Sequence, residues 1–153
     1  NIDKAKIGIM GFSAGGHLAS TVGTHFKTKN QRPAFMILGY PVVTMDSTYT
    51  HMGSRRNLLG TKPSEELVKK FSNELQVTTK TPPTFIVHAK DDGAVPIANS
   101  RNLLKALEKM GVSAMLQEYD LGGHGFGMRK KGIPADNWTD VLKQWLVKQG
   151  LVK

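Results

Sequence analysis

One short run of residues constrains this chain more than any other feature: Gly11-Phe12-Ser13-Ala14-Gly15. An apolar stretch, residues 7–10, precedes the run, and a helix-like stretch, residues 17–22, follows it. Glycines beside a serine allow a sharp turn, because a Cβ at those places would collide with the neighbouring strand or helix. The run therefore predicts a strand, a tight turn and a helix, with the Ser13 hydroxyl exposed where the strand ends.

A serine held on such a turn is typical of a nucleophile. The helix that begins after it directs free backbone N–H groups and partial positive charge toward the hydroxyl, so the Ala14 N–H is the expected donor to an oxyanion. The structural alternative is an ordinary helix N-cap, in which the Ser13 hydroxyl accepts a hydrogen bond from a backbone N–H two or three residues further on.

A nucleophilic serine needs a general base, and the base needs a partner that fixes its tautomer. Residues 84–88 form a short apolar run that leads into a polar turn with Asp91 and Asp92. After another apolar run, residues 114–119, a glycine-rich loop surrounds His124. The order serine, acid, histidine is that of the α/β-hydrolases. We therefore expect His124 to be the base and one of the two aspartates to be its partner.

Other ionisable residues are weaker candidates. Asp120 precedes His124 too closely to reach across a site. We expect His17 to pack in the first turn of the helix and His88 to end a buried strand with its ring hydrogen-bonded to the backbone. His25 and His51 have no neighbours that argue for chemistry.

The chain resembles the α/β-hydrolase esterases related to acetyl xylan esterases. The runs that carry this resemblance are residues 12–19, 39–42, 88–96 and 122–126, with further similarity at 51–60, 72–75 and 81–84. Together they cover nearly the whole chain from residue 6 onward. In this group the acid follows the strand histidine by four residues and precedes Val-Pro by three. That position is Asp92, which leaves Asp91 as a solvated neighbour.

The resemblance implies a fold and an activity. The fold is α/β, namely the α/β-hydrolase fold, and the activity is serine-dependent hydrolysis of a carboxylic ester without a cofactor. The implied partner is a small-molecule or oligosaccharide ester, such as an acetylated xylan fragment. Tyr40, Pro41 and Arg55 are tentative substrate-binding residues. Two alternatives stay open: a prolyl-oligopeptidase-like peptidase, with the same fold and order of catalytic residues, and a catalytically silent fragment that acts as an interaction module.

The rest of the chain alternates strand-like and helix-like segments. Strands are expected at residues 6–12, 35–40, 84–88 and 114–119, and helices at 14–24, after Ser64, at 96–110 and at 136–148. Residues 42–60 show no sustained period and predict a loop or a small cap. Strands that alternate with helices predict a parallel sheet flanked by helices.

The length of 153 residues corresponds to one domain, residues 1–153. An α/β-hydrolase normally has about eight strands and a nucleophile after the fifth. We therefore expect the C-terminal portion of that fold, without its N-terminal strands and without the loop that supplies a second oxyanion donor. Residues 1–5 resemble the end of a linker. The strand before Ser13 would then have an open edge, through which the chain could self-associate.

Charge and composition exclude several classes of partner. The net charge is +9, but the basic residues are scattered and aromatic residues do not alternate with them, so we expect no nucleic-acid binding. No apolar stretch reaches the length of a membrane span. With no cysteine and no metal-ligand spacing among the histidines, we expect no metal site. The paired glycines do not fit a phosphate-binding loop, so we expect no nucleotide cofactor.

Overall fold

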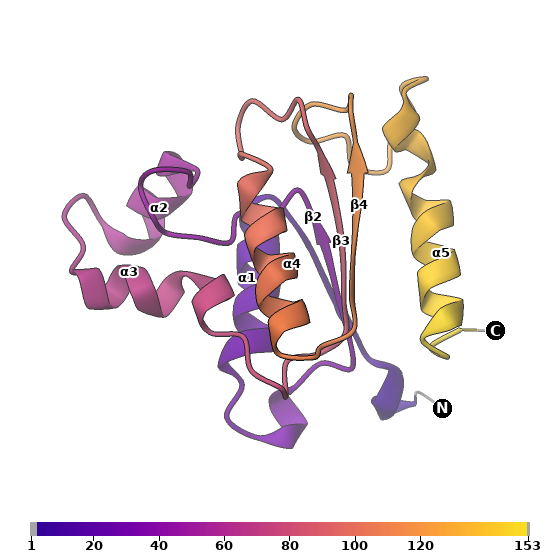
Figure 1. Cartoon of the computed structure of the whole chain (residues 1–153), viewed down its shortest axis with the longest axis horizontal. Coiled ribbons are helices and arrows are strands. Elements are labelled where there is room, and N and C mark those ends of the chain that lie inside the picture. The colour runs from indigo at the N-terminus through magenta and orange to yellow at the C-terminus, as the bar shows by residue number, and fades with distance from the viewer. Residues whose placement is uncertain (1–2, 153) are drawn as a thin grey trace.

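The computed structural model describes residues 3–152 and consists of a parallel sheet between layers of helices (Figure 1). The sheet has four strands in the order β1-β2-β3-β4, and every neighbouring pair is parallel. The strands are β1 (Ile9–Phe12), β2 (Met36–Gly39), β3 (Thr84–Ala89) and β4 (Ala114–Tyr119). Their carboxyl ends therefore meet at one edge of the sheet.

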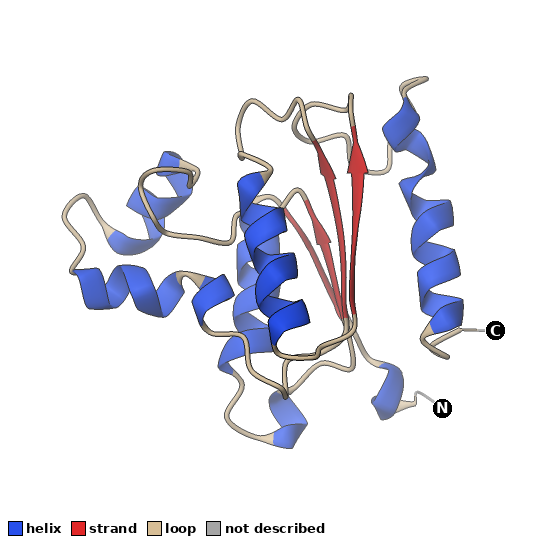
Figure 2. Cartoon of the chain, viewed as in Figure 1, coloured by secondary structure: helices blue, strands red, loops and turns tan. Residues whose placement is uncertain are grey.

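Helices lie on both faces of this sheet (Figure 2). The α-helices are α1 (Ala14–His25), α2 (Met52–Leu59), α3 (Glu65–Phe71), α4 (Ala98–Lys109) and α5 (Trp138–Lys148). Helices α1 and α4 cover one face and α5 covers the other, while α2 and α3 project beyond α1 (Figure 1). Short 3-10 helices lie at Lys4–Lys6, Lys29–Gln31, Asn73–Leu75 and Pro134–Asn137.

The two central strands, β2 and β3, are buried along their whole length. Alternate side chains enter different cores: Phe85 and Val87 pack with Trp138 and Trp145 of α5, whereas Ile86 packs on the opposite face, with α1 and α4. Burial on both faces explains why these strands are continuous apolar runs in the sequence instead of alternating ones.

The predicted parallel α/β arrangement is confirmed, with differences at the element bounds. Strand β1 is shorter than residues 6–12, because Lys4–Lys6 form a 3-10 helix. The expected helix after Ser64 is α3, and the Ser64 hydroxyl accepts a hydrogen bond from the Leu67 N–H at 3.2 Å. Within 42–60, where a loop or a small cap was expected, the structure has helix α2, none of whose residues is buried and whose sequence shows no sustained apolar period.

Strand β1 lies at one end of the sheet and pairs with β2 along one side. Apolar side chains close to this edge are exposed, including Ile7 at 51% and Met10 at 47%. Leu18 and Val22 of α1 are also exposed. An unpaired strand edge beside apolar side chains is a surface on which another chain can pair.

We therefore predict that the 153-residue polypeptide self-associates. Light scattering over a dilution series should show dimers or larger species at micromolar concentration. Replacing Met10 with Lys on the exposed edge should shift the distribution toward monomer, since a charge on an edge strand opposes pairing. A well-folded monomer at all concentrations would contradict this prediction.

The turn between β1 and α1 depends on very close packing. A Cβ added to Gly11 would overlap the backbone carbonyl of Gly15 and would lie 2.9 Å from the Ala19 Cβ. A Cβ at Gly16 would lie 2.6 Å from the Pro41 Cβ. The strand and the helix could not approach this closely with larger residues at these positions.

A matched pair of substitutions tests this packing. Gly11→Ala should lower the free energy of unfolding by about 3 kcal/mol, because rigid backbone would have to move. Gly15→Ala should leave stability unchanged or raise it by up to about 1 kcal/mol, because alanine favours helix and the added Cβ would have no atom within 4 Å. Denaturant unfolding of both variants provides the measurement, and equal effects would contradict the explanation.

Candidate active site

Ser13 lies in the turn between β1 and α1 with an unusual backbone conformation. Its φ is +53°, a value that is strained for a residue with a side chain. Backbone hydrogen bonds hold it there: the Ser13 N–H donates to the Gly39 carbonyl at 2.9 Å, and the Ser13 carbonyl accepts from the N–H groups of Gly16 and Val42 at 3.0 Å and of His17 at 3.3 Å. The end of β2 thus fixes the turn that directs the hydroxyl outward.

The Ser13 hydroxyl lies 2.8 Å from Nε2 of His124, although 111 residues separate them. The same hydroxyl makes no capping bond to α1, so the N-cap alternative is wrong. On the other side of the ring, Nδ1 of His124 lies 2.7 Å from Oδ2 of Asp92. A carboxylate only accepts, so Nδ1 carries the proton and Nε2 accepts from the Ser13 hydroxyl.

The Asp92 carboxylate is fully buried and held by several donors. Oδ1 accepts from the backbone N–H groups of Ala94 at 2.9 Å and Val95 at 2.8 Å. Burial alone would raise the pKa of Asp92, but the hydrogen bonds from Val95, His124 and Ala94 outweigh it and hold the pKa below the usual value. Asp92 is therefore a carboxylate at neutral pH and can orient an imidazole.

The expectation that Asp91 is only a solvated neighbour of Asp92 is wrong. Asp91 is exposed, but it is not a free solvated neighbour: its Oδ1 accepts hydrogen bonds from the N–H groups of Gly122 at 2.9 Å and Gly123 at 2.8 Å. These contacts tie the end of β3 to the loop that carries His124. The two adjacent aspartates thus make different contacts: Asp92 contacts the imidazole of His124, and Asp91 contacts the backbone of the loop that carries it. Asp120 instead pairs with Lys90 at 2.6 Å.

The imidazole of His124 is also held by an aromatic contact. The ring of Tyr40 lies 5.0 Å from the His124 ring in an edge-to-face arrangement and 4.7 Å from the ring of Phe126. Tyr40 is only 4% exposed and has a φ of +35°. The structure thus gives Tyr40 a packing contact with His124, and a direct contact with substrate stays a prediction for this residue.

The other two tentative substrate-binding residues also have structural contacts. Pro41 is buried and packs against Gly16 of α1. Arg55 of α2 donates from Nε to the Met45 carbonyl at 2.9 Å and is partly exposed. A role for either residue in substrate binding stays a prediction.

Two further histidines are buried near this site. Nε2 of His17 lies 2.8 Å from the Phe71 carbonyl and ties α1 to α3, and burial lowers the pKa of His17. His88 contacts Asp92 directly: besides the backbone contact that we expected, its Nε2 is 3.2 Å from Oδ2 of Asp92. The four-residue spacing from His88 to Asp92 is visible in the sequence, but the contact depends on how the turn after β3 folds back.

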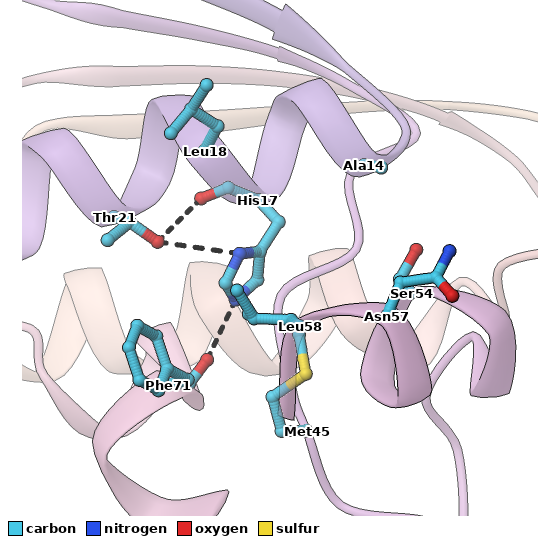
Figure 3. A pocket seen from close by; sticks show the side chains of 9 residues that line it. All are labelled: Ala14, His17, Leu18, Thr21, Met45, Ser54, Asn57, Leu58 and Phe71. Atoms are coloured by element: carbon cyan, nitrogen blue, oxygen red, sulfur yellow. Dashed lines mark hydrogen bonds between the residues drawn. The ribbon is translucent and has the colours of Figure 1, made fainter. Parts of the chain in front are cut away.

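A cavity of about 370 Å³ follows one face of α1 from Ala14, the residue after Ser13 (Figure 3). Ala14, His17, Leu18 and Thr21 of α1 line one side, and Met45, Ser54, Asn57, Leu58 and Phe71 line the other. Five of these nine residues are apolar, and His17, Thr21, Ser54 and Asn57 supply the polar groups. The Ala14 N–H belongs to the first turn of α1, where backbone N–H groups lack partners within the helix.

Two further findings concern residues 3–152. No cluster of three or more histidine, aspartate or glutamate side chains is arranged to hold a metal ion. No helix in this part of the chain has both the length and the apolar character needed to cross a membrane.

Known proteins resemble this chain over nearly its whole length. An acetylxylan esterase of Xylanibacter ruminicola is 40% identical over 150 residues, which are 95% of this chain and 31% of the esterase. An endo-1,4-beta-xylanase B of Butyrivibrio fibrisolvens is 40% identical over 135 residues, which are 82% of this chain and 21% of the xylanase.

Among solved structures, an acetyl ester-xyloside bifunctional hydrolase of Caldicellulosiruptor lactoaceticus matches with a TM-score of 0.95 and 40% identity, over 99% of this chain and 60% of that one. The chain thus spans about a fifth to three fifths of the relatives that it matches. The expected resemblance to acetyl xylan esterases is confirmed.

A family model matches a range of residues that includes β1, the turn after it, and Ser13, Asp92 and His124. Residues 1–150 match the prolyl oligopeptidase family. This match accounts for the α/β-hydrolase fold and for the chain order of Ser13, Asp92 and His124. The chain therefore belongs to the prolyl oligopeptidase family of α/β-hydrolases.

Proposed function

We propose that this chain carries the catalytic residues of a serine-dependent carboxylic ester hydrolase. The observation that supports this most directly is the unbroken chain of hydrogen bonds from the Ser13 hydroxyl through His124 to Asp92, at 2.8 and 2.7 Å. Ser13 is the nucleophile, His124 is the general base, and Asp92 orients the imidazole and stabilises its protonated form. Ser13 directly follows β1, while Asp92 and His124 lie in the loops that follow β3 and β4, and the carboxyl ends of these strands meet at one edge of the sheet.

The reaction follows from the proton positions. Ser13 Oγ attacks the ester carbonyl carbon while its proton passes to Nε2 of His124. The tetrahedral intermediate collapses, and the imidazolium returns that proton to the departing alcohol. Water then attacks the acyl group on Ser13 in the same way, so the carboxylic acid leaves and the serine hydroxyl is restored.

The oxyanion of the intermediate needs hydrogen-bond donors. The Ala14 N–H is one donor, since it lies at the start of α1 next to the nucleophile. We expect the second donor to come from a loop outside these 153 residues. Loss of one such donor typically lowers kcat by about a hundred- to a thousandfold. The isolated polypeptide should therefore be a weak catalyst even with its three side chains in place.

The proposed substrate is an ester of an acylated carbohydrate, such as an acetylated xylan fragment. This rests on two relatives at 40% identity, an acetylxylan esterase and an acetyl ester-xyloside hydrolase. The cavity along α1 begins at Ala14 and is large enough to hold part of such a substrate beside Ser13. Arg55, Tyr40 and Pro41 stay candidate contacts on the alcohol side.

A peptidase activity is the second candidate, because the family takes its name from prolyl oligopeptidases. The relatives at 40% identity are named for acetyl ester and xylan hydrolysis, and this favours the esterase. Acetylated xylo-oligosaccharides and proline-containing peptides supplied to the same preparation discriminate between the two. A catalytically silent fragment would hydrolyse neither and would react with no serine-directed probe.

The first test is covalent labelling of the nucleophile. A fluorophosphonate probe should label the protein at its natural length on Ser13, and Ser13→Ala should abolish the label. Ser20→Ala is the matched control, because the Ser20 hydroxyl is buried and bonds to the His17 carbonyl at 3.0 Å. Peptide mapping by mass spectrometry locates the label, and stoichiometric labelling elsewhere would refute the assignment.

The adjacent aspartates provide the second test. Asp92→Asn should lower kcat for a small acetyl ester by about 10³- to 10⁴-fold, because an amide cannot hold Nδ1 of His124 in the required tautomer. Asp91→Asn should have little effect, since its amide oxygen can still accept from Gly122 and Gly123. Steady-state kinetics of both variants provides the comparison. The opposite ranking would transfer the acid role to Asp91.

A further inference from the structure

The Asp92 carboxylate has a second imidazole partner that the reaction above does not use. His88 is the fifth residue of β3, and its side chain is completely buried. Nε2 of His88 lies 3.2 Å from Oδ2 of Asp92, the same oxygen that accepts the hydrogen bond from Nδ1–H of His124. One carboxylate oxygen is thus shared by two histidines.

The surroundings of His88 fix its tautomer. Nε2 faces two groups that can only accept, Oδ2 of Asp92 and the Val95 carbonyl at 3.0 Å. Nε2 must therefore carry a proton. Nδ1 lies 2.7 Å from the Ser100 hydroxyl, which can donate to it. His88 is then a neutral imidazole with every polar atom satisfied, and burial lowers the pKa of His88 in agreement with this.

With His88 included, the Asp92 carboxylate accepts four hydrogen bonds. Oδ1 accepts from the two backbone N–H groups of Ala94 and Val95, and Oδ2 accepts from the two imidazoles. Four is the number of lone-pair sites on a carboxylate. Rotation of the carboxylate would therefore break bonds on both oxygens, and His88 holds the oxygen that contacts His124.

We propose that His88 is a positioning residue for the catalytic acid: its Nε2–H holds Oδ2 of Asp92 in line with His124, and its Nδ1 anchors this arrangement to α4 through Ser100. The proposal rests on the esterase function proposed above. It extends the hydrogen-bonded series to Ser13, His124, Asp92, His88 and Ser100, with all of the last three buried.

The other titratable groups near His88 are either paired or neutral. Glu118 of β4 is the register partner of His88, and both of its oxygens bond to Arg101 of α4 at 2.7 Å. Lys90, after the end of β3, pairs with Asp120. Tyr40 lies against His124, and burial raises the pKa of Tyr40, so the phenol stays neutral. Asp92 and His124 are thus the groups on which a change at His88 acts most directly.

The proposal predicts a change in the pH profile and not only in stability. His88→Phe keeps a ring of similar size but removes the donor to Oδ2. More of the charge on that oxygen then acts on His124 and stabilises its protonated form, so the acid limb of the kcat/KM profile should move up by about half a pH unit. Looser placement of Asp92 should also lower kcat by about tenfold, with KM little changed.

His88→Gln is the conservative variant, because its amide can place an N–H group near Oδ2. It should restore most of kcat and return the acid limb toward the wild-type position. Thr84→Val is the control for burial, since Thr84 lies on the same strand, is equally buried, and bonds only to the Pro82 carbonyl at the far end. The midpoint of thermal unfolding of Thr84→Val should fall, while the pH dependence of kcat/KM should stay as in the wild-type protein.

A ground-state measurement keeps this test separate from the esterase proposal. In the protein at its natural length, labelled with 15N-histidine, the proton of the His124–Asp92 hydrogen bond should shift downfield in His88→Phe and stay in place in Thr84→Val. An unmoved resonance together with an unmoved acid limb would overturn the proposal and leave His88 as a packing residue. If the wild-type protein hydrolyses no ester, the esterase function fails, and the resonance alone decides the role of His88.

Discussion

A buried, ionised carboxylate is the constraint on which the rest of this site depends. A charge without solvent is costly unless donors surround it, and Asp92 meets that requirement through two backbone N–H groups and two imidazoles. The turn after β3 must therefore fold tightly enough to bring the N–H groups of Ala94 and Val95 to the carboxylate. The geometry that satisfies the charge also fixes where His124 can lie.

Ser13 is held differently, by close packing and backbone hydrogen bonds that maintain a strained turn. The positive φ of Ser13 persists because Gly39 at the end of β2 accepts from its N–H and Val42, just after β2, donates to its carbonyl, and because Gly11 lets α1 approach β1. The sheet thus holds the strained turn on one side while the buried carboxylate holds the imidazole on the other. Both supports arise from parallel strands whose carboxyl ends meet at one edge.

The loop that carries His124 lies between the turn at Ser13 and the buried carboxylate of Asp92. Asp91 binds its backbone at Gly122 and Gly123, and Tyr40, which follows β2, packs edge-to-face on the His124 ring. Tyr40 itself has a positive φ. Asp91 and Tyr40 thus contribute backbone and packing contacts that keep Ser13, Asp92 and His124 within hydrogen-bond distance.

The sequence by itself determined the parallel α/β arrangement and the three candidate side chains, because a glycine-flanked serine between a strand and a helix and the order serine, aspartate, histidine are local patterns. Helix α2 was not predicted, because none of its residues is fully buried and its sequence therefore shows no sustained apolar period. Only the tertiary structure decided that Asp91 holds a loop, that Tyr40 packs on His124, and that His88 shares an oxygen of Asp92. Each of these contacts depends on how the turns after the strands fold back over the edge of the sheet. The spacing of residues along the chain does not determine that geometry.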